Sequence, residues 1–303
     1  MLENNFKTEK IPHRVVVIGS GGFIGREIVK QLKLNNIPIL TLSRIDVDFL
    51  EDGAGIKLTK FLVPNDVLIF AAAIAPCTNL ISFQKNIKMI NELCTFLEKC
   101  PVSHLIYLSS DAVYKDSKTP IVESSCAEPS SLHGAMHLTR EIALRQSYVG
   151  PLTIVRPTLV YGLEDTHNGY GPNKFRRLAS KGDPIVLFGQ GEELRDHVDV
   201  EDVAILISKI IMFRSCGIVN AVSGEVVSFR KIAEFIANEF NPKVLVKGSI
   251  RLTEMPHGGY RAFDNSNLMS AFPGFKFKSW RDGLSQLHKK FISQSRLDSC
   301  DEL

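Results

Sequence analysis

The sequence predicts a doubly wound α/β fold, in which helices cover both faces of a parallel sheet, together with a smaller mixed lobe. Short runs of valine, isoleucine and leucine recur in the first half of the chain, as in strands that are buried on both faces. Helical segments separate most of these runs, and strands that alternate with helices build parallel sheets. From about residue 162 glycines, prolines and polar residues loosen the pattern, which indicates a second lobe interleaved with the last sheet elements.

The predicted elements follow one another along the chain. Arg14–Ile18 is rich in valine and gives the first buried strand, and a glycine turn then opens a helix over residues 22–34. Further apolar runs predict strands at residues 38–42, 67–73, 105–108 and 152–155. Helices are expected over residues 83–99, 131–147, 198–213 and from 228 to about 240. An irregular tail follows, and its polar last residues, 294–303, are expected to be frayed.

The composition excludes several classes of protein. The 303 residues are 44% hydrophobic and 23% charged, which is typical of a soluble protein with a sizeable core. The net charge of +3 is too small to indicate a nucleic-acid partner. Charged residues precede the first apolar run, so no signal peptide is expected, and no apolar stretch reaches the roughly 18 residues of a membrane span.

The six cysteines form no Cys-x-x-Cys pair and show no spacing typical of a disulfide framework. We therefore expect free thiols and a cytoplasmic protein, because the cytoplasm keeps thiols reduced. The cysteines are Cys77, Cys94, Cys100, Cys126, Cys216 and Cys300.

Three glycines, Gly19, Gly22 and Gly25, stand three residues apart in a turn that follows a strand and opens a helix. Glycine lets the backbone turn tightly and approach a pyrophosphate, while the N-terminus of the helix faces the negative charge. We therefore predict that this turn binds a dinucleotide, with Phe23 and Ile24 beside it. The alternative is a glycine turn that serves only as a loop.

The next strand ends where the ribose of a dinucleotide is recognised, and here the chain has Ser43 followed by Arg44. An acid at this place would bond the 2′-hydroxyl of NAD and repel a 2′-phosphate, whereas a guanidinium can grip that phosphate. NADP is therefore favoured over NAD. Arg44 can also be a solvated surface charge, and Asp46 and Asp48 lie close enough to leave the assignment open.

Further motifs follow in order along the chain. Residues 66–73 read Asp-Val-Leu-Ile-Phe-Ala-Ala-Ala, and residues 105–114 read Leu-Ile-Tyr-Leu-Ser-Ser-Asp-Ala-Val-Tyr. Residues 156–162 read Arg-Pro-Thr-Leu-Val-Tyr-Gly, residues 189–192 Gly-Gln-Gly-Glu, and residues 195–203 Arg-Asp-His-Val-Asp-Val-Glu-Asp-Val. Over nearly the whole chain this order resembles the extended branch of the short-chain dehydrogenase/reductase family, whose members modify nucleotide sugars with NAD(P).

The resemblance implies how the chain is divided. Residues 1–162 and about 195–226 would form the dinucleotide-binding domain, and about 163–194 and 227–303 the substrate-binding lobe. A homodimer is expected from the resemblance alone. In this family the cofactor is contacted by residues at and just after the strand ends, here Asp48, Ala71, Ala72, Ala73 and Pro157.

The same resemblance implies a nucleotide-diphosphate sugar as the ligand. Arg195 corresponds to an arginine that lies near the diphosphate in relatives, and Asn173 and Arg261 align with other contacts of the substrate lobe. Arginines suit a diphosphate because their paired N–H donors meet paired oxygens. Each arginine can instead belong to a surface or interlobe ion pair.

Family enzymes use a serine or threonine, a tyrosine and a lysine, and the tyrosine exchanges a proton with a sugar hydroxyl while hydride moves. Ser110 corresponds to the first of these, and Asp111 follows it as in sugar-nucleotide dehydratases and 4-ketoreductases, where the acid can transfer a proton. Ser110 can instead bond only backbone at the strand end, and Asp111 can be a turn-capping carboxylate. At the tyrosine and lysine positions stand His133 and His137, which share one helix face.

A histidine has a pKa of about 6.5, so His133 can exchange protons near neutral pH without a lysine, and His137 can donate one hydrogen bond to the ribose. One interpretation is therefore an NAD(P)-dependent nucleotide-sugar epimerase, dehydratase or 4-ketoreductase with His133 in place of tyrosine. Another is a catalytically silent protein that still binds cofactor or nucleotide sugar. The remaining alternatives are a zinc site with Asp111 as third ligand, a purely structural pair, and catalysis by another group such as Tyr114. We expect no metal.

Overall fold

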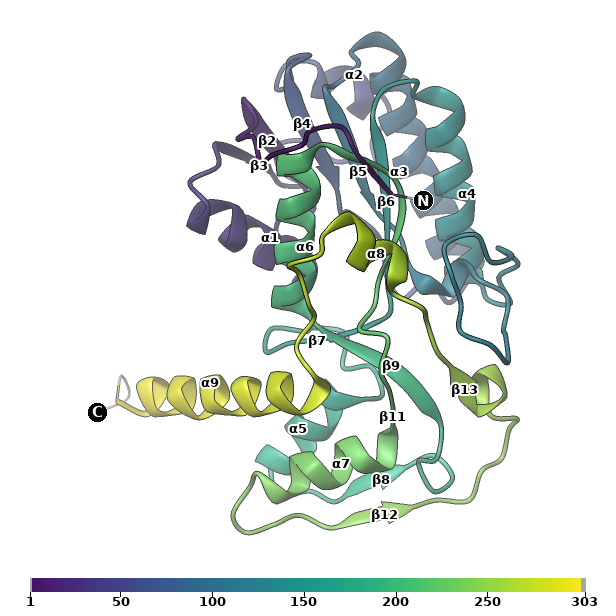
Figure 1. Cartoon of the computed structure of the whole chain (residues 1–303), viewed down its shortest axis with the longest axis vertical. Helices are drawn as coiled ribbons and strands as arrows, with labels where there is room; N and C mark the ends of the chain where they lie inside the picture. The colour runs from purple at the N-terminus through teal and green to yellow at the C-terminus, as the bar shows by residue number, and fades with distance from the viewer. Residues whose placement is uncertain (1, 301–303) are drawn as a thin grey trace.

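A seven-stranded sheet forms the larger part of the protein (Figure 1), whose computed structural model describes residues 2–300, with side chains to residue 294. Neighbouring strands are parallel except at one edge, where β1 runs antiparallel to β10. This arrangement confirms the predicted class. The strand order is β1 (Glu3–Asn4), β10 (Ser215–Ala221), β6 (Leu152–Pro157), β5 (His104–Leu108), β4 (Asp66–Phe70), β2 (Arg14–Ile18) and β3 (Ile39–Leu42).

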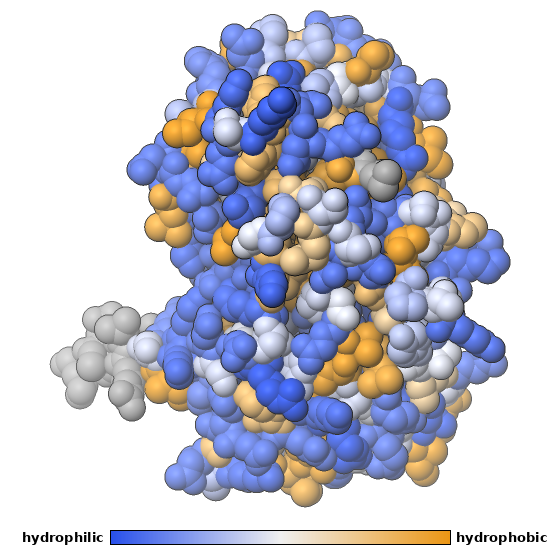
Figure 2. All heavy atoms as spheres, in the orientation of Figure 1, coloured by the Kyte–Doolittle hydropathy of each residue, from blue (hydrophilic) through white to orange (hydrophobic). Residues whose placement is uncertain are grey.

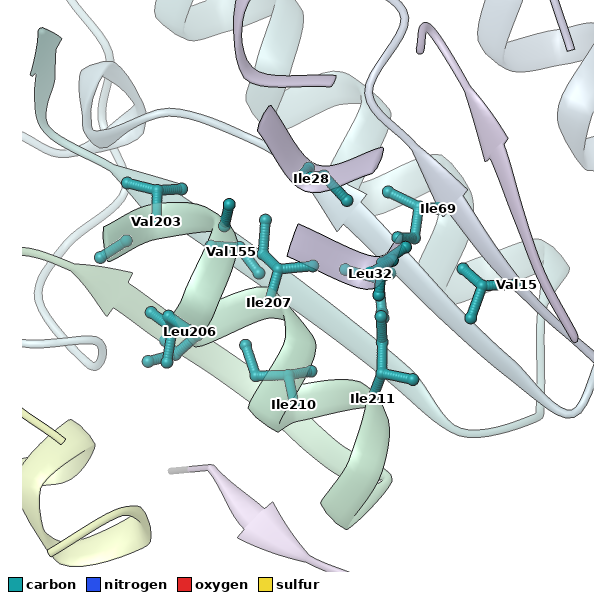
Figure 3. Close-up of a cluster of buried hydrophobic side chains, with 14 of the residues drawn as sticks. Val15, Ile28, Leu32, Ile69, Val155, Val203, Leu206, Ile207, Ile210 and Ile211 are labelled. Carbon is teal, nitrogen blue, oxygen red and sulfur yellow. The ribbon is translucent and has the colours of Figure 1, made fainter. Parts of the chain in front are cut away.

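Both faces of the sheet are buried, because alternate residues of each strand meet helices on opposite sides. Val15 and Val17 belong to the core of one face, which Figure 3 shows in part, and Val16 and Ile18 belong to the core of the other. The helices of the first face are α1 (Phe23–Leu34), α6 (Val200–Phe213) and the short α8 (Ser266–Ala271). Those of the second are α2 (Ala54–Leu58), α3 (Leu80–Lys99) and α4 (Leu132–Ser147).

A smaller lobe lies below this sheet in Figure 1, around a four-stranded sheet in which β9 pairs with three other strands. Its core is rich in aromatic side chains, among them Phe175, Phe229 and Trp280. The strands of that sheet are β7 (Leu159–Tyr161), β9 (Leu194–Asp199), β11 (Val226–Ser228) and β13 (Tyr260–Arg261), and a separate pair consists of β8 (Ile185–Leu187) and β12 (Val246–Gly248). The helices of the lobe are α5 (Pro172–Ser180), α7 (Phe229–Asn238) and α9 (Trp280–Cys300).

The structure corrects the sequence prediction around residue 198. Residues up to Asp199 extend strand β9, and helix α6 begins only at Val200. The reason is a helix cap: the Asp199 carboxylate accepts a hydrogen bond from the Glu201 backbone N–H at 2.8 Å, which fixes the helix start. Strand β10, which directly follows α6, was also not predicted.

The second correction concerns the segment after α7, which was expected to be an irregular tail. It contains α8 (Ser266–Ala271) and then α9, which is anchored because Leu284 and Leu287 are buried in the core of the smaller lobe. Helix α9 continues to Cys300, and the rest of the predicted frayed end, residues 301–303, lies outside the described residues.

Other expectations concern the surface and the cysteines. Cysteines 77, 94, 100, 126 and 216 are free thiols, and the side chain of Cys300 lies outside the described part. None of the described helices has the length and apolar character needed to cross a membrane. Figure 2 shows a mostly hydrophilic face with small separate hydrophobic patches. The domain boundaries stay a prediction; β9 belongs to the smaller sheet, and the α6 and β10 that follow it belong to the larger one.

Candidate active site

The glycine turn is packed so tightly that larger residues would not fit. Gly19 has φ +89°, and a Cβ at this position would lie 2.6 Å from the backbone nitrogen of Ala72. A Cβ on Gly25 would collide with the carbonyl oxygen of Gly19, which also accepts a hydrogen bond from the Gly22 N–H at 3.0 Å. The turn is therefore pressed against the end of β4, the segment that the sequence placed beside a cofactor.

The N-terminus of α1 is open to an anion. Gly22 is its N-cap residue and has no side chain to accept a hydrogen bond from the first turn, which begins with the half-buried Phe23 and Ile24. Such a terminus leaves N–H groups and the positive end of the helix dipole for a negatively charged ligand. The turn and the helix thus fit the pyrophosphate of a dinucleotide.

The residues after the end of β3 differ in whether their side chains already have partners within the protein. The backbone N–H and the hydroxyl of Ser43 both donate to the Asp46 carboxylate, at 2.8 and 2.7 Å. Asp48 accepts from the Leu50 N–H at 2.9 Å. Arg44 is exposed, and no described carboxylate pairs with it. Of these side chains, the guanidinium is therefore the one that remains free for a phosphate.

The two histidines lie at the start of α4 with their rings in contact. Their ring centres are 4.8 Å apart and the rings meet edge to face, at 82°. His133 is half-buried and its Nδ1 accepts from the Cys77 backbone N–H at 3.4 Å. His137 is buried, and its Nδ1 shares a hydrogen bond of 2.7 Å with the hydroxyl of Tyr107 on β5. The pair therefore combines one ring that reaches the surface with one fixed in the interior.

Both histidines favour the neutral form. Burial lowers the pKa of His133, while the nearby Asp111 carboxylate raises it to a lesser degree. Burial, followed by the neighbouring His133 and Arg140, lowers the pKa of His137 well below its usual value. At pH 7 each ring is therefore neutral, with one protonated and one unprotonated nitrogen.

A short turn places Ser110 and Asp111 beside the start of α4, which carries the two histidines. The turn is η1 (Asp111–Val113), and the Ser110 hydroxyl oxygen caps it by accepting from the Ala112 N–H at 3.2 Å. A Cβ on Gly134 would collide with the carbonyl oxygen of Ala112, so η1 lies directly against the start of α4. The structure thus assembles Ser110, Asp111 and His133 from the ends of two separate elements.

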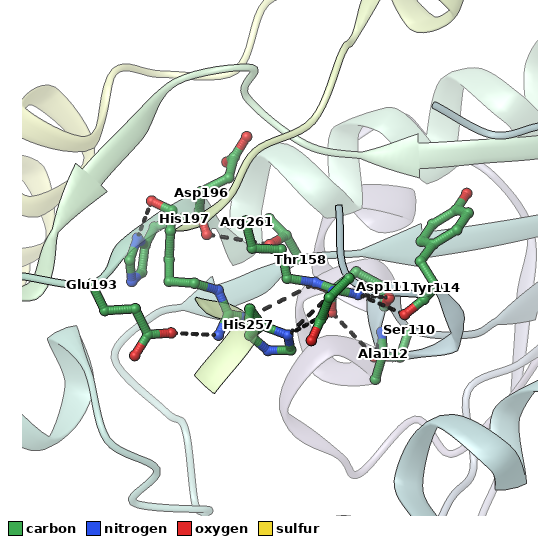
Figure 4. A network of polar contacts seen from close by, with 12 residues as sticks. Ser110, Asp111, Ala112, Tyr114, Thr158, Glu193, Asp196, His197, His257 and Arg261 are labelled. Atoms are coloured by element: carbon green, nitrogen blue, oxygen red, sulfur yellow. Dashed lines mark hydrogen bonds and ion pairs between the residues drawn. The ribbon is translucent and has the colours of Figure 1, made fainter. Parts of the chain in front are cut away.

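Two arginines from the smaller lobe reach this turn but are held by carboxylates, and Figure 4 shows one of them, Arg261, beside Asp111. Arg261 is 1% exposed and donates to Asp111 at 3.0 Å and to Asp116 at 2.7 Å. Arg195 donates to Glu193 at 3.2 Å and lies 3.8 Å from the Asp111 carboxylate. A diphosphate would therefore have to replace these carboxylates as the partner of the arginines.

Other predicted residues have structural partners as well. The Asn173 side chain accepts from the Gly162 N–H at 3.0 Å and donates to Asp165 at 2.9 Å, and it lines a cavity of about 250 Å³ between α5 and α9. Pro157 is buried at the end of β6. No group of three or more potential metal-binding side chains occurs in the described part of the chain, and Asp111, the proposed third zinc ligand, is engaged by Arg261.

Sequence reasoning missed Tyr107 and Arg140. Tyr107 stands between Ile106 and Leu108 in a buried strand, and the sequence pattern gave no sign that its hydroxyl supports a histidine. Arg140 follows His133 by seven residues and His137 by three, and this helical spacing could have placed it on the histidine face.

Comparison with known proteins adds a family and a fold. Residues 15–221 match the sequence model of the NAD dependent epimerase/dehydratase family. A dTDP-4-keto-6-deoxy-D-glucose reductase of Streptomyces niveus is 25% identical over 195 residues, which are 62% of this chain and 62% of that protein. The structure resembles UDP-glucose 4-epimerase of Thermus thermophilus in complex with NAD (TM-score 0.81, 22% identity, 92% of this chain and 99% of that one). It also resembles a GDP-L-fucose synthetase of Naegleria fowleri bound to NADP (TM-score 0.78, 17% identity, 97% and 98%).

Proposed function

The chain belongs to the NAD dependent epimerase/dehydratase family, and we propose that it acts on a nucleotide-diphosphate sugar, with His133 as the proton-exchanging group. The observation that supports this most strongly is the position of His133. Its ring is half-buried, lies against the buried His137, and stands beside the turn that holds Ser110 and Asp111. An imidazole in this setting can do acid/base work without a lysine.

The proposed cofactor seat is the glycine turn, the N-terminus of α1 and the exposed Arg44, which favours NADP over NAD. NAD(P), when bound, supplies or accepts the hydride. An NADP preference favours the reduction of a keto sugar over epimerisation and dehydration. The similar Streptomyces niveus protein is a reductase acting on a 4-keto sugar nucleotide, which agrees with this choice.

Two donors would meet the sugar oxygen in such a reduction. The Cys77 amide donates to Nδ1 of His133, so the neutral ring carries its proton on Nε2 and can offer it to the keto oxygen. The Ser110 hydroxyl oxygen accepts a hydrogen bond from the Ala112 N–H, and the hydroxyl proton makes only a long contact of 3.5 Å with Asp111. This proton can therefore also be donated to the keto oxygen of the sugar. The neutral Nε2–H donates a hydrogen bond to the oxygen as negative charge develops on it, and the proton that completes the new hydroxyl is relayed from solvent by the half-exposed ring.

The smaller lobe would hold the diphosphate. Arg195 and Arg261 supply paired donors, and both are preorganised by carboxylates in the protein alone. Binding then exchanges Asp111, Asp116 and Glu193 for phosphate oxygens. This exchange would also release the Asp111 carboxylate near His133, so that substrate binding and proton transfer are coupled.

The test is to supply purified protein with NADPH and a panel of 4-keto and ordinary nucleotide sugars, and to identify products and co-purifying ligands by mass spectrometry. The proposal expects conversion of at least one nucleotide sugar. A second candidate, a silent protein that only binds cofactor or nucleotide sugar, is supported by the carboxylate-bound state of both arginines. Binding without conversion, with turnover appearing only after His133→Tyr and His137→Lys together, would decide for that candidate.

A further inference from the structure

Arg140 is a buried cation without a carboxylate partner. It is 0% exposed, and no carboxylate of the described residues lies within ion-pair distance of it. The guanidinium instead donates to the carbonyl oxygen of Ala72 at 3.0 Å and lies 5.0 Å from the ring centre of Phe70 and 5.6 Å from that of Tyr107. Its Nε has no hydrogen-bond partner. Because an unpaired buried charge is expensive, such a side chain calls for a functional explanation.

Arg140 lies on the helix face that carries the two histidines. Positions 133, 137 and 140 are separated by four and three residues, which places them along one face of α4. Arg140 and His137 also share a neighbour. The Tyr107 ring lies beside the guanidinium, and its hydroxyl bonds Nδ1 of His137 at 2.7 Å. The charge is therefore one side chain away from the buried histidine.

The second contact of Arg140 leads to the glycine turn. Arg140 holds the carbonyl group of Ala72, and the nitrogen of Ala72 lies so close to Gly19 that a Cβ there would come within 2.6 Å of it. One guanidinium thus fixes both the backbone segment against the proposed cofactor seat and the ring that holds His137.

We propose that Arg140 is a positioning residue that, together with Tyr107, fixes His137 as a neutral hydrogen-bond donor toward the cofactor, a role that rests on the proposed function. In the proposed arrangement Tyr107 donates its hydroxyl proton to Nδ1 of His137, which places the ring proton on Nε2. No described residue bonds Nε2, which leaves it for a ligand. The fixed charge of Arg140 opposes a second proton on the ring.

The ionisation of the neighbours agrees with this arrangement. Burial raises the pKa of Tyr107 to about 12, so the phenol keeps the proton that it donates. Burial first, and then His133 and Arg140, lower the pKa of His137, so that ring stays neutral. Other charged or titratable groups also face this cluster. Cys94 of α3 lies near Arg140, and Glu141 of α4 affects the pKa of Tyr107. Asp111 of η1 and His167 affect the pKa of His133. Glu141 is itself bound by Arg145 and Arg156.

The test is NMR of the ligand-free protein with isotope-labelled histidine, because ring nitrogen and carbon shifts report charge and tautomer separately. In the native protein His137 should be a neutral Nε2–H tautomer and remain so below pH 6. Arg140→Met should raise its pKa by about one unit or more, whereas Arg140→Lys, which keeps a charge, should restore most of the native value. Tyr107→Phe should add the Nδ1–H tautomer. Thr139→Ala, at an exposed position of the same turn, is the matched control.

The outcomes separate this role from a merely structural one. A folded Arg140→Met variant with an unchanged His137 pKa, or a native His137 with its proton on Nδ1, would overturn the proposal. Should Arg140→Met fail to fold, Tyr107→Phe decides, because an unchanged tautomer contradicts the arrangement and a mixed one supports it. These spectra need no substrate or turnover, so a failure of the proposed reaction would leave them unaffected and the two proposals fail independently.

Discussion

Substitution by alanine is expected to disturb the protein at one position of the glycine turn and to leave it nearly unchanged at another. A Cβ on Gly25 would overlap the carbonyl oxygen of Gly19 and lie 2.9 Å from its carbonyl carbon, both of them backbone atoms that cannot swing away. A Cβ on Gly21 would meet nothing within 4 Å. Gly25→Ala therefore has to displace the turn from the N-terminus of α1, and Gly21→Ala does not.

The expected sizes follow from these contacts. Overpacking of this kind costs about 1–3 kcal/mol of folding free energy. A displaced turn also loses N–H bonds to the pyrophosphate, and one charge-assisted hydrogen bond contributes about 1.5–3 kcal/mol, so the Kd for NADPH should rise by about tenfold to a hundredfold. Gly21→Ala should stay within about 0.5 kcal/mol in stability and about twofold in Kd.

Isothermal titration calorimetry with NADPH, paired with urea unfolding of the unliganded proteins, measures both quantities. Native affinity in Gly25→Ala would refute the placement of the cofactor in this turn. An equal loss of affinity in Gly21→Ala would refute the reasoning from contacts, because that position has no neighbours to displace.

Three further predictions use other parts of the chain. Burial lowers the pKa of His104 to about 4, so the unfolded chain binds a proton that the folded chain does not, and stability falls as the pH drops below about 6.5. Because His104→Gln removes this dependence, the stability advantage of the native protein over the variant should shrink by about 2 kcal/mol between about pH 7.5 and pH 5 in urea unfolding. A difference that stays constant with pH would contradict this prediction. Arg44→Ala should weaken NADPH binding by about tenfold and leave NADH unchanged in calorimetry, and an equal effect on both would remove the argument for NADP. Glu141→Gln removes a buried negative charge that accepts hydrogen bonds from Arg156 at 2.9 Å and from Ser109 at 2.6 Å, and it should lower the free energy of unfolding in urea by about 3–5 kcal/mol. A decrease of less than about 1 kcal/mol would show that the hydrogen-bond network rearranges around the amide.

The parts of the fold that depend on local pattern were predictable from the sequence. A strand such as Arg14–Ile18 is apolar because both of its faces are covered, and the glycine spacing reflects contacts inside one turn. The histidine pair was predictable for the same reason, because two positions one helical turn apart share a face whatever surrounds them.

Contacts between distant residues set the limit of that prediction. Arg261 meets Asp111 across 150 positions of sequence, and only the folded lobe shows that this carboxylate is engaged by an arginine. Tyr107 holds His137 from a buried strand, and the sequence pattern of that strand does not show which residue its hydroxyl will meet. The start of α6 depended on a single capping carboxylate, Asp199, which stands between Val198 and Val200.

Hydride transfer from NADPH deuterated at C4 to a nucleotide sugar tests the central claim most directly, with native protein and His133→Ala compared by mass spectrometry. Native protein should place deuterium in the sugar. His133→Ala should do so at least about a hundredfold more slowly, with its affinity for NADPH nearly unchanged. Transfer at the native rate in His133→Ala would contradict the assignment of proton exchange to this histidine.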